Sequence, residues 1–250
     1  MPGAVEIWSI DLDAAAPELL ALEAEAGLMA AQDRAAVANL IDPAAAVRRL
    51  AASIGLRVLL SGLEGREIAT RPFVRGANGK PGLPGAGHHF NITHSGPAAL
   101  IALSSHPVGI DLERLRPVRM ESRRRRLIEA AALAVADGAP ITGRSDEQRF
   151  LQAWTRLEAL AKADGCGIGR LLTEIGAVGP RRNEDEGPPS AWLQALAAAH
   201  ETQDLVLEGD AIGAVSASRE AIIDAVPRRL PSIRTALEAL LKRPRTIGGA

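Results

Sequence analysis

Aromatic residues are scarce in this chain of 250 residues: they make up 2% of it, and tyrosine is absent. Alanine, leucine, isoleucine and valine must therefore fill the core. Cysteine occurs once, as Cys166, so no disulfide can form within the chain, which fits a reducing compartment. This excludes a small scaffold held together by disulfides, and the length predicts one or two domains with a sizeable core.

The chain also lacks long apolar runs and a strong net charge. No stretch approaches the roughly 18 to 20 apolar residues of a membrane helix, and no basic segment followed by an apolar run opens the sequence. The formal net charge is −1, which gives no general basic field for nucleic acid. These absences predict a cytoplasmic protein that binds neither membranes nor nucleic acid.

The first hundred residues predict a strand followed by two helices. Residues 5–12 alternate apolar and polar side chains, which is typical of a strand, and an Ala- and Leu-rich helix is expected from Pro17 to Leu28. A second helix is expected from Pro43 to Ser61, with Asp42 as its cap. Arg49 lies on this second helix.

Three short strands are expected next, at residues 89–96, 100–103 and 108–112, and the last two are predicted to form an antiparallel pair. Two helices follow, the first opened by the arginine run 123–126 and the second capped by Asp146 and continuing through Lys162. The arginine run predicts a solvated helix face or a contact with an acidic partner. Further strands are expected at residues 171–178 and 204–217.

This order of elements predicts an α+β fold. The rough plan of strand, helices and strands occurs once before about residue 105 and once after it. We therefore expect two similar lobes, residues 1–105 and 106–226, with a functional site between them and a C-terminal tail over residues 227–250.

Two carboxylates stand two positions apart in a predicted strand, at Asp111 and Glu113. Alternate side chains of a strand point to one face, so both carboxylates would share a face. Such a pair is a candidate site for Mg²⁺ or Mn²⁺, which take oxygen ligands and leave positions for water and phosphate. The alternative is a solvated strand end, with Glu113 paired to Arg114 or Arg116.

Glu158 and Lys162 are four positions apart in a predicted helix, so they lie on one face. Taken alone they form an exposed ion pair of a common kind, worth only about 0.3 kcal/mol. Together with Asp111 and Glu113 they provide three carboxylates and an ammonium. That set is suited to a divalent cation that holds a phosphorylated ligand.

Four motifs in this order resemble those of the 4'-phosphopantetheinyl transferases. They are Gly79-Lys80-Pro81, Phe90-Asn91-Ile92-Thr93-His94-Ser95, Gly109-Ile110-Asp111-Leu112-Glu113 and Trp154-Thr155-x-x-Glu158-x-x-x-Lys162-x-x-Gly165-x-Gly167. Each motif alone is weak evidence for the family, but four in the right order are strong evidence. The resemblance spans about residues 79 to 169, and it is to the longer, pseudo-dimeric kind that activates surfactin synthetase and similar enzymes.

The resemblance implies a transfer reaction. Enzymes of this family move the 4'-phosphopantetheine arm of coenzyme A to a serine of an apo acyl or peptidyl carrier protein and release adenosine 3',5'-bisphosphate. It also implies a monomer made of two similar α+β halves in a pseudo-twofold arrangement, with coenzyme A in the cleft between them. Mg²⁺ is the implied cofactor, and Mn²⁺ is an alternative.

The resemblance further implies roles for the carboxylates and the lysine. Asp111, Glu113 and Glu158 would hold Mg²⁺ against the pyrophosphate of coenzyme A. Glu158, or a water held by this cluster, would take the proton of the serine hydroxyl. Lys162 would neutralise charge on the phosphate that is attacked.

Binding of the nucleotide end of coenzyme A would fall to residues of the first half. Lys80 and His94 would contact the nucleotide, with His94 near the 3'-phosphate, and Thr93 supplies a hydroxyl where the family usually has serine. Ser53 stands where the family has a helical arginine, and Arg49, one turn earlier, would take over its contact. Without the family, Lys80 and His94 would be read as a solvated loop residue and a structural histidine.

Two other functions remain open. In the first, the chain is a non-catalytic relative that binds coenzyme A or a carrier protein; Leu157, where the family usually has lysine, would then mark lost activity. In the second, it is a metal-dependent phosphohydrolase that uses the same carboxylates with water as the nucleophile. The first is disfavoured by the complete set of Asp111, Glu113, Glu158 and Lys162, and the second predicts phosphate release without a protein acceptor.

Overall fold

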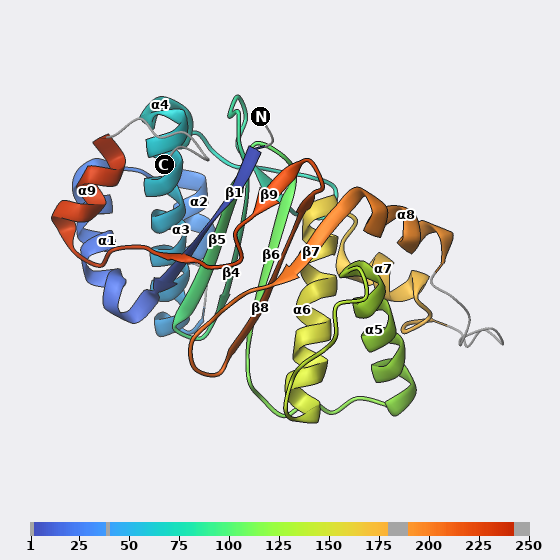
Figure 1. The fold of residues 1–250 in the computed structure, drawn as a ribbon. Coiled ribbons are helices and arrows are strands. Elements are labelled where there is room, and N and C mark those ends of the chain that lie inside the picture. Colours follow the sequence, from blue (N-terminus) through green and yellow to red (C-terminus); the bar gives the residue numbers. More distant parts are fainter. Residues whose placement is uncertain (1–2, 39–40, 180–189, 243–250) are drawn as a thin grey trace.

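A mixed five-stranded sheet and an antiparallel three-stranded sheet pack against each other in the middle of the molecule, and helices cover both outer sides (Figure 1). The computed structural model describes residues 3–38, 41–179 and 190–242. The predicted α+β class is confirmed. Within these residues no helix is both long and apolar enough to cross a membrane.

The N-terminal sheet is built around β1 (Gly3–Asp11), which pairs antiparallel with β5 (Ala98–Ser104). β5 in turn pairs with β4 (His89–Ser95), which forms one edge of the sheet. The other side of β1 carries two short parallel strands from the far end of the chain, β9 (Ala221–Ile223) and β10 (Arg228–Arg229). Alternate side chains of β1 belong to two different hydrophobic cores, one on each face of the sheet.

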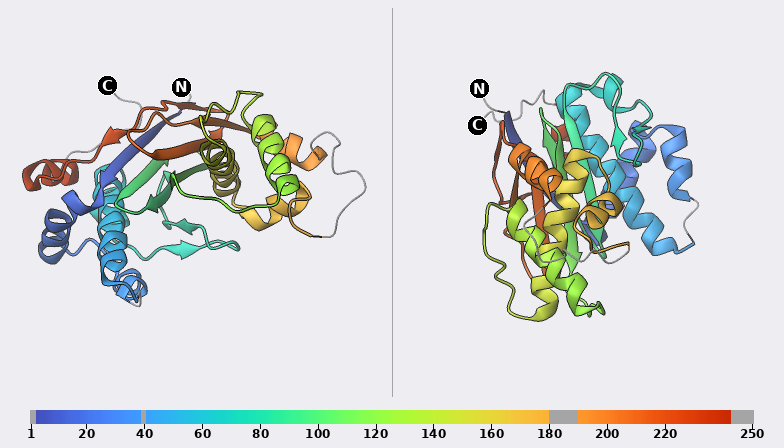
Figure 2. Two further views of the ribbon diagram at one scale, coloured as in Figure 1. Left: turned by 90° about the horizontal axis from the view of Figure 1, so that it is seen from below. Right: turned by 90° about the vertical axis from the view of Figure 1, so that its right-hand side faces the viewer.

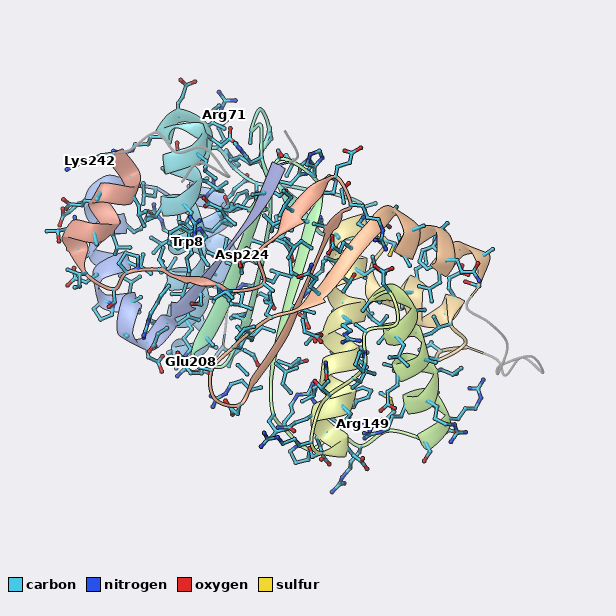
Figure 3. All side chains as sticks on the ribbon, in the orientation of Figure 1. Trp8, Arg71, Arg149, Glu208, Asp224 and Lys242 are labelled. Atoms are coloured by element: carbon cyan, nitrogen blue, oxygen red, sulfur yellow. The ribbon has the colours of Figure 1, made fainter. Side chains whose placement is uncertain are left out.

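Trp8 and Ile10 of β1 face the N-terminal helices, as Figure 3 shows for Trp8. Val5 and Ile7 face the second sheet, where they join a core shared by both sheets. The period-2 pattern of the sequence thus reflects burial on both faces rather than one. The helices on this side are α1 (Leu12–Ala26), α2 (Ala31–Ala38), α3 (Pro43–Glu64), α4 (Arg66–Ala69) and α9 (Arg234–Lys242).

The C-terminal sheet consists of β6 (Val108–Arg114), β8 (Ala211–Ser218) and β7 (His200–Asp204), in that order. Its outer side is covered by a long helix, α6, that packs against β6 and β8. The helices of this half are α5 (Ser122–Val135), α6 (Asp146–Asp164), α7 (Ile168–Glu174) and α8 (Ala191–Ala199).

A small hairpin of β2 (Val74–Arg75) and β3 (Pro81–Gly82) reaches from the N-terminal half towards the end of α6 (Figure 2). The Asn78 side chain donates a hydrogen bond of 2.6 Å to the carbonyl oxygen of Gly165. Gly165 ends α6 with a left-handed backbone (φ 84°), which glycine adopts without steric cost. The hairpin is therefore tied to the helix terminus that carries the last predicted motif.

Several predicted elements are confirmed with shifted ends. α3 starts at Pro43 with Asp42 as its cap, as predicted. α1 begins at Leu12 rather than Pro17, because the Asp11 side chain accepts the backbone N–H of Ala14 and caps the helix there. The cap of α6 is Ser145 rather than Asp146.

Other predictions are wrong. β5 and β6 do not pair: among the described residues they belong to different sheets, because β1 and β4 already occupy both edges of β5. Residues 168–174 form a helix, whereas a strand was predicted from residue 171. The strand predicted over 204–217 is interrupted by the loop between β7 and β8, so only residues 211–218 form β8.

Apart from the β2–β3 hairpin, both halves share one order of elements: a strand, helices and two further strands. In the first half β1 pairs with β5 and β5 with β4, and in the second half β6 pairs with β8 and β8 with β7. This supports the prediction of two similar halves, while their pseudo-twofold relation and the boundaries near residues 105 and 226 stay predictions. Part of the predicted tail, residues 227–242, contributes β10 and α9 to the N-terminal side; residues 243–250 lie outside the described part of the chain.

Each half contains an arginine buried on its long helix. Arg57 of α3 pairs with Asp33 (2.6 Å) and donates to the carbonyl oxygen of Ala69, and its guanidinium lies over the Phe73 ring. Arg156 of α6 has an exposed fraction of 1%. These buried charges need partners, because an unpaired buried charge is costly.

Replacing Asp204 with asparagine tests the network around Arg156. Asp204 accepts two hydrogen bonds from the Arg156 guanidinium, at 2.8 and 2.6 Å. Removing its charge should lower the free energy of unfolding by about 2 kcal/mol, which corresponds to a Tm roughly 6 °C lower at this chain length. Asp210→Asn is the control, because the Asp210–Arg114 pair is exposed and exposed pairs contribute little. Equal Tm values for both variants would contradict the expectation.

Candidate active site

Strand β6 lies unusually close to helix α6, and Gly109 makes this possible. A Cβ atom at Gly109 would lie 2.1 Å from the carbonyl oxygen of Ala159 and 2.3 Å from the backbone nitrogen of Ala163. Since side chains alternate along a strand, Asp111 and Glu113 lie on the same side of β6 as Gly109. The close approach therefore places both carboxylates beside α6.

The structure brings Asp111 together with the two predicted residues of α6. The Lys162 ammonium lies 2.5 Å from Oδ1 of Asp111 and 3.9 Å from Oε2 of Glu158. It also donates to the carbonyl oxygen of Ile110, at 3.4 Å. Lys162 is thus a half-buried link between α6 and β6, not the solvated side chain of a surface ion pair.

The charges of the neighbouring side chains act on Glu158. Burial raises the pKa of Glu158; the Lys162 ammonium opposes this shift, and the charges of Asp111 and Glu113 add to it. Repulsion between carboxylates has this effect only at short range. Glu158 is therefore better able to accept a proton than an ordinary exposed glutamate.

Glu113 also forms an ion pair with Arg116, which is one of the two pairs expected if these carboxylates were a solvated strand end. Its Oε1 accepts a hydrogen bond of 3.1 Å from the Arg116 guanidinium. In the described part of the chain, no three Asp, Glu, His or Cys side chains already stand as a ready set of metal ligands. The donor chemistry of Asp111, Glu113 and Glu158 nevertheless suits a hard divalent cation, because all three supply carboxylate oxygens.

Thr93 connects this group to the N-terminal half. Its hydroxyl donates to Oδ1 of Asp111 at 3.3 Å, and both residues are buried. Thr93 lies on β4, at the edge of the N-terminal sheet that faces β6. This group of side chains therefore comes from both sheets.

His94 follows Thr93 on β4, and Arg49 lies on α3. Burial lowers the pKa of His94, and the nearby charges of Arg49 and Lys162 lower it further. Arg48, next to Arg49, is instead paired with Asp13 at 2.8 Å. The charges of Arg49 and Lys162 thus disfavour the protonated ring of His94, and an anionic ligand bound there would favour it.

Lys80 bonds to backbone of the C-terminal half. Its ammonium donates to the carbonyl oxygens of Val108 (3.0 Å) and Ala163 (3.1 Å), which ties the hairpin to the start of β6 and the end of α6. Burial lowers its pKa to about 8, against a smaller opposing effect of Asp164. Contact with a nucleotide stays a prediction for Lys80.

The two positions at which the chain departs from the family pattern have local explanations. Leu157 is fully buried in the core between α5 and α6, so it points away from Glu158 and Lys162. The Ser53 hydroxyl donates to the carbonyl oxygen of Arg49, at 2.9 Å. Sequence reasoning missed Asn91, whose side-chain oxygen accepts the N–H of Ile110; its only signal was a place in the second motif.

Comparisons with known proteins identify the family of the chain. Residues 107–214 match the model of the 4'-phosphopantetheinyl transferase superfamily. The transferase HetI of Nostoc is 34% identical over 177 residues, which cover 67% of this chain and 71% of HetI. The chain therefore belongs to the 4'-phosphopantetheinyl transferase superfamily.

Within this enzyme class the chain is of the Sfp-like type. The 4'-phosphopantetheinyl transferase Sfp of Bacillus subtilis is 36% identical over 96 residues, which cover 37% of this chain and 39% of Sfp. A putative 4'-phosphopantetheinyl transferase of Synechocystis is 31% identical over 140 residues, or 53% of its length. The match to HetI thus covers most of that relative, whereas the match to Sfp covers about two fifths of it.

Proposed function

We propose that this protein transfers the 4'-phosphopantetheine group of coenzyme A to a serine of an apo acyl or peptidyl carrier protein. The observation that carries the proposal is the group formed by Asp111, Lys162 and Glu158, joined through Thr93 to the other half of the molecule. The charges of Arg49 and Lys162 also act on His94, which follows Thr93 on β4. Such a site can hold the pyrophosphate and the 3'-phosphate of coenzyme A together.

In the proposed reaction the serine oxygen forms a bond to the phosphorus that carries the pantetheine arm. The bond from that phosphorus to the bridging oxygen breaks, and adenosine 3',5'-bisphosphate leaves. Glu158 accepts the serine proton, for which its raised pKa suits it. The Lys162 ammonium stabilises the negative charge on the phosphate oxygens.

Asp111, Glu113 and Glu158 are the residues that would hold Mg²⁺, with Mn²⁺ as an alternative. A bound Mg²⁺ neutralises negative charge on a pyrophosphate and orients it. Lys162 already balances part of the negative charge of Asp111 and Glu158. Its ammonium can therefore contact a bound phosphate and still lie near the two carboxylates.

The function is tested by incubating the protein with coenzyme A, Mg²⁺ and an apo carrier protein, followed by mass spectrometry of the carrier. A mass gain of one phosphopantetheine group supports the proposal. Binding of coenzyme A without transfer to any of several carriers would favour a non-catalytic relative. Release of inorganic phosphate without an acceptor would favour a phosphohydrolase.

The pH dependence of nucleotide binding tests the place of His94. Because its pKa lies below the ordinary value, His94 is mostly neutral near pH 7 in the free protein. An anionic ligand favours the protonated ring, so adenosine 3',5'-bisphosphate should bind more tightly as the pH falls from 8 to 6. A ligand-induced pKa rise of one unit would give up to about a tenfold change in Kd.

The measurement is a calorimetric titration of the bisphosphate at several pH values, with His94→Asn as the comparison. The phosphate groups titrate in the same range, but they do so equally for both proteins. The difference between wild type and variant therefore reports on His94 alone. The same pH dependence in both would remove His94 from the nucleotide site.

A further inference from the structure

The backbone of β6 at the edge that faces β4 is bonded by side chains rather than by another strand. β8 pairs with one edge of β6, and the other edge faces β4, with no ladder between β4 and β6 among the residues that the structure describes. Unpaired backbone groups at a buried edge need partners. Lys80 donates to the carbonyl oxygen of Val108, and Lys162 donates to that of Ile110.

Asn91 supplies a third contact along this edge. Its side-chain oxygen accepts the backbone N–H of Ile110 at 2.9 Å, and its exposed fraction is only 5%. Asn91 comes from β4, two residues before Thr93, so both side chains point to the same side of that strand. Thr93 contacts Asp111, the residue that follows Ile110.

The two contacts fix one strand edge against the other at consecutive residues of β6. The bond between Asn91 and Ile110 holds the β6 backbone, and the next residue places its carboxylate between Thr93 and Lys162. A short side chain with a single acceptor oxygen sets this spacing closely. Without it, β6 could shift along β4, and the Asp111 carboxylate would move with it.

We propose that Asn91 is a positioning residue, which keeps Asp111 in place for the cation and the pyrophosphate by holding the N–H of Ile110. The inference rests on the proposed function for its consequence in catalysis, while its structural part stands on the hydrogen bond itself. A buried amide that merely stabilises the fold would lower stability without changing the requirement for Mg²⁺. The two roles can therefore be separated.

The test compares Asn91→Ala with Gln152→Ala. Gln152 is the matched control, because it is a buried amide of the C-terminal half that bonds Asp204 at 2.6 Å and the backbone N–H of Thr142 at 2.9 Å. Both variants lose a buried amide, but the hydrogen bond of Asn91 goes to β6, whereas those of Gln152 go to Thr142, Gly143 and Asp204. Each is measured for the Mg²⁺ concentration at half-maximal transfer and, without metal or coenzyme A, for amide hydrogen exchange at Ile110.

In Asn91→Ala the Ile110 amide should exchange faster than in wild type, and the half-saturating Mg²⁺ concentration should rise about tenfold or more, as for residues that orient metal ligands. Gln152→Ala should leave both quantities unchanged. Asn91→Asp keeps an acceptor oxygen at the same place, so it should protect the Ile110 amide even if the alanine variant does not fold.

Unchanged exchange at Ile110 in a folded Asn91→Ala protein, or loss of protection in Asn91→Asp, would overturn the inference. An unchanged Mg²⁺ requirement in an active Asn91→Ala enzyme would also overturn it, while leaving the proposed function intact. A wild-type protein that transfers nothing to any carrier would instead refute the proposed function. The exchange measurement would still decide whether Asn91 holds β6.

Discussion

Replacing Glu158 with glutamine is expected to lower kcat for carrier modification by about a hundredfold to ten-thousandfold, the usual contribution of a general base. Glutamine has nearly the same shape but cannot accept the serine proton. It also carries no negative charge for a cation or for Lys162, which lies 3.9 Å away. The loss should therefore appear in kcat at saturating coenzyme A and carrier, and raising either concentration should not restore it.

The dependence of kcat on pH is a second test of Glu158 as the base. Glu158 must be deprotonated to act as a base, so kcat should fall as the pH drops through its pKa. Burial and the neighbouring carboxylates raise that pKa, so the fall should occur at a higher pH than for an exposed glutamate. Glu158→Gln should remove this limb of the profile, and only its small residual activity should remain.

Glu147→Gln is the matched control for Glu158→Gln. Glu147 lies in the first turn of the same helix, three turns from the site, and the chemical change is identical. Its kcat should stay at the wild-type value, and both variants should keep the thermal stability of a folded protein. A Glu158→Gln enzyme with full activity would exclude Glu158 as both base and metal ligand.

The sequence was sufficient for the part of the site that depends on local periodicity. Asp111 and Glu113 share a face because strands alternate, and Glu158 and Lys162 share a face because helices repeat near four residues. Neither pattern shows that the two faces meet. The order of the motifs supplied that step, and the contact of Lys162 with Asp111 agrees with it.

Pairing between distant segments was less accessible. β5 and β6 follow each other in sequence, yet β5 pairs with β1 and β4, since the N-terminal strand inserts between later ones. β9 and β10 join the same sheet from the far end of the chain. Local propensity carries no information on which edge a strand meets, so these pairings required the whole fold.

The hydrogen-bond partners of single polar side chains could not be predicted from the sequence either. Lys80 was expected in a solvated loop or at a nucleotide, but its ammonium is held by two carbonyl oxygens of the C-terminal half. Asn91 stands in a motif that drew attention to Thr93 and His94. Only the position of β6 shows that its oxygen has a backbone partner there.

Replacing Gly109 with alanine should be among the most destabilising single-methyl changes in this chain. The added Cβ would meet backbone atoms of Ala159 and Ala163 at 2.1 and 2.3 Å, far inside normal contact. Backbone of a packed helix cannot rotate away as a side chain can, so β6 and α6 must separate. We expect a loss of about 3 kcal/mol or more in the free energy of unfolding.

At this chain length that loss corresponds to a Tm roughly 9 °C lower, which differential scanning calorimetry would measure. Gly169→Ala is the control: Gly169 lies in α7, and a Cβ there meets nothing within 4 Å. Alanine is the better helix former, so this variant should match or slightly exceed the wild-type Tm.

Because separation of β6 from α6 also moves Asp111 away from Lys162, Gly109→Ala should lose transfer activity even at temperatures where it stays folded. Wild-type Tm and activity in Gly109→Ala would show that β6 and α6 are not packed this closely, and the site built on their contact would have to be redrawn.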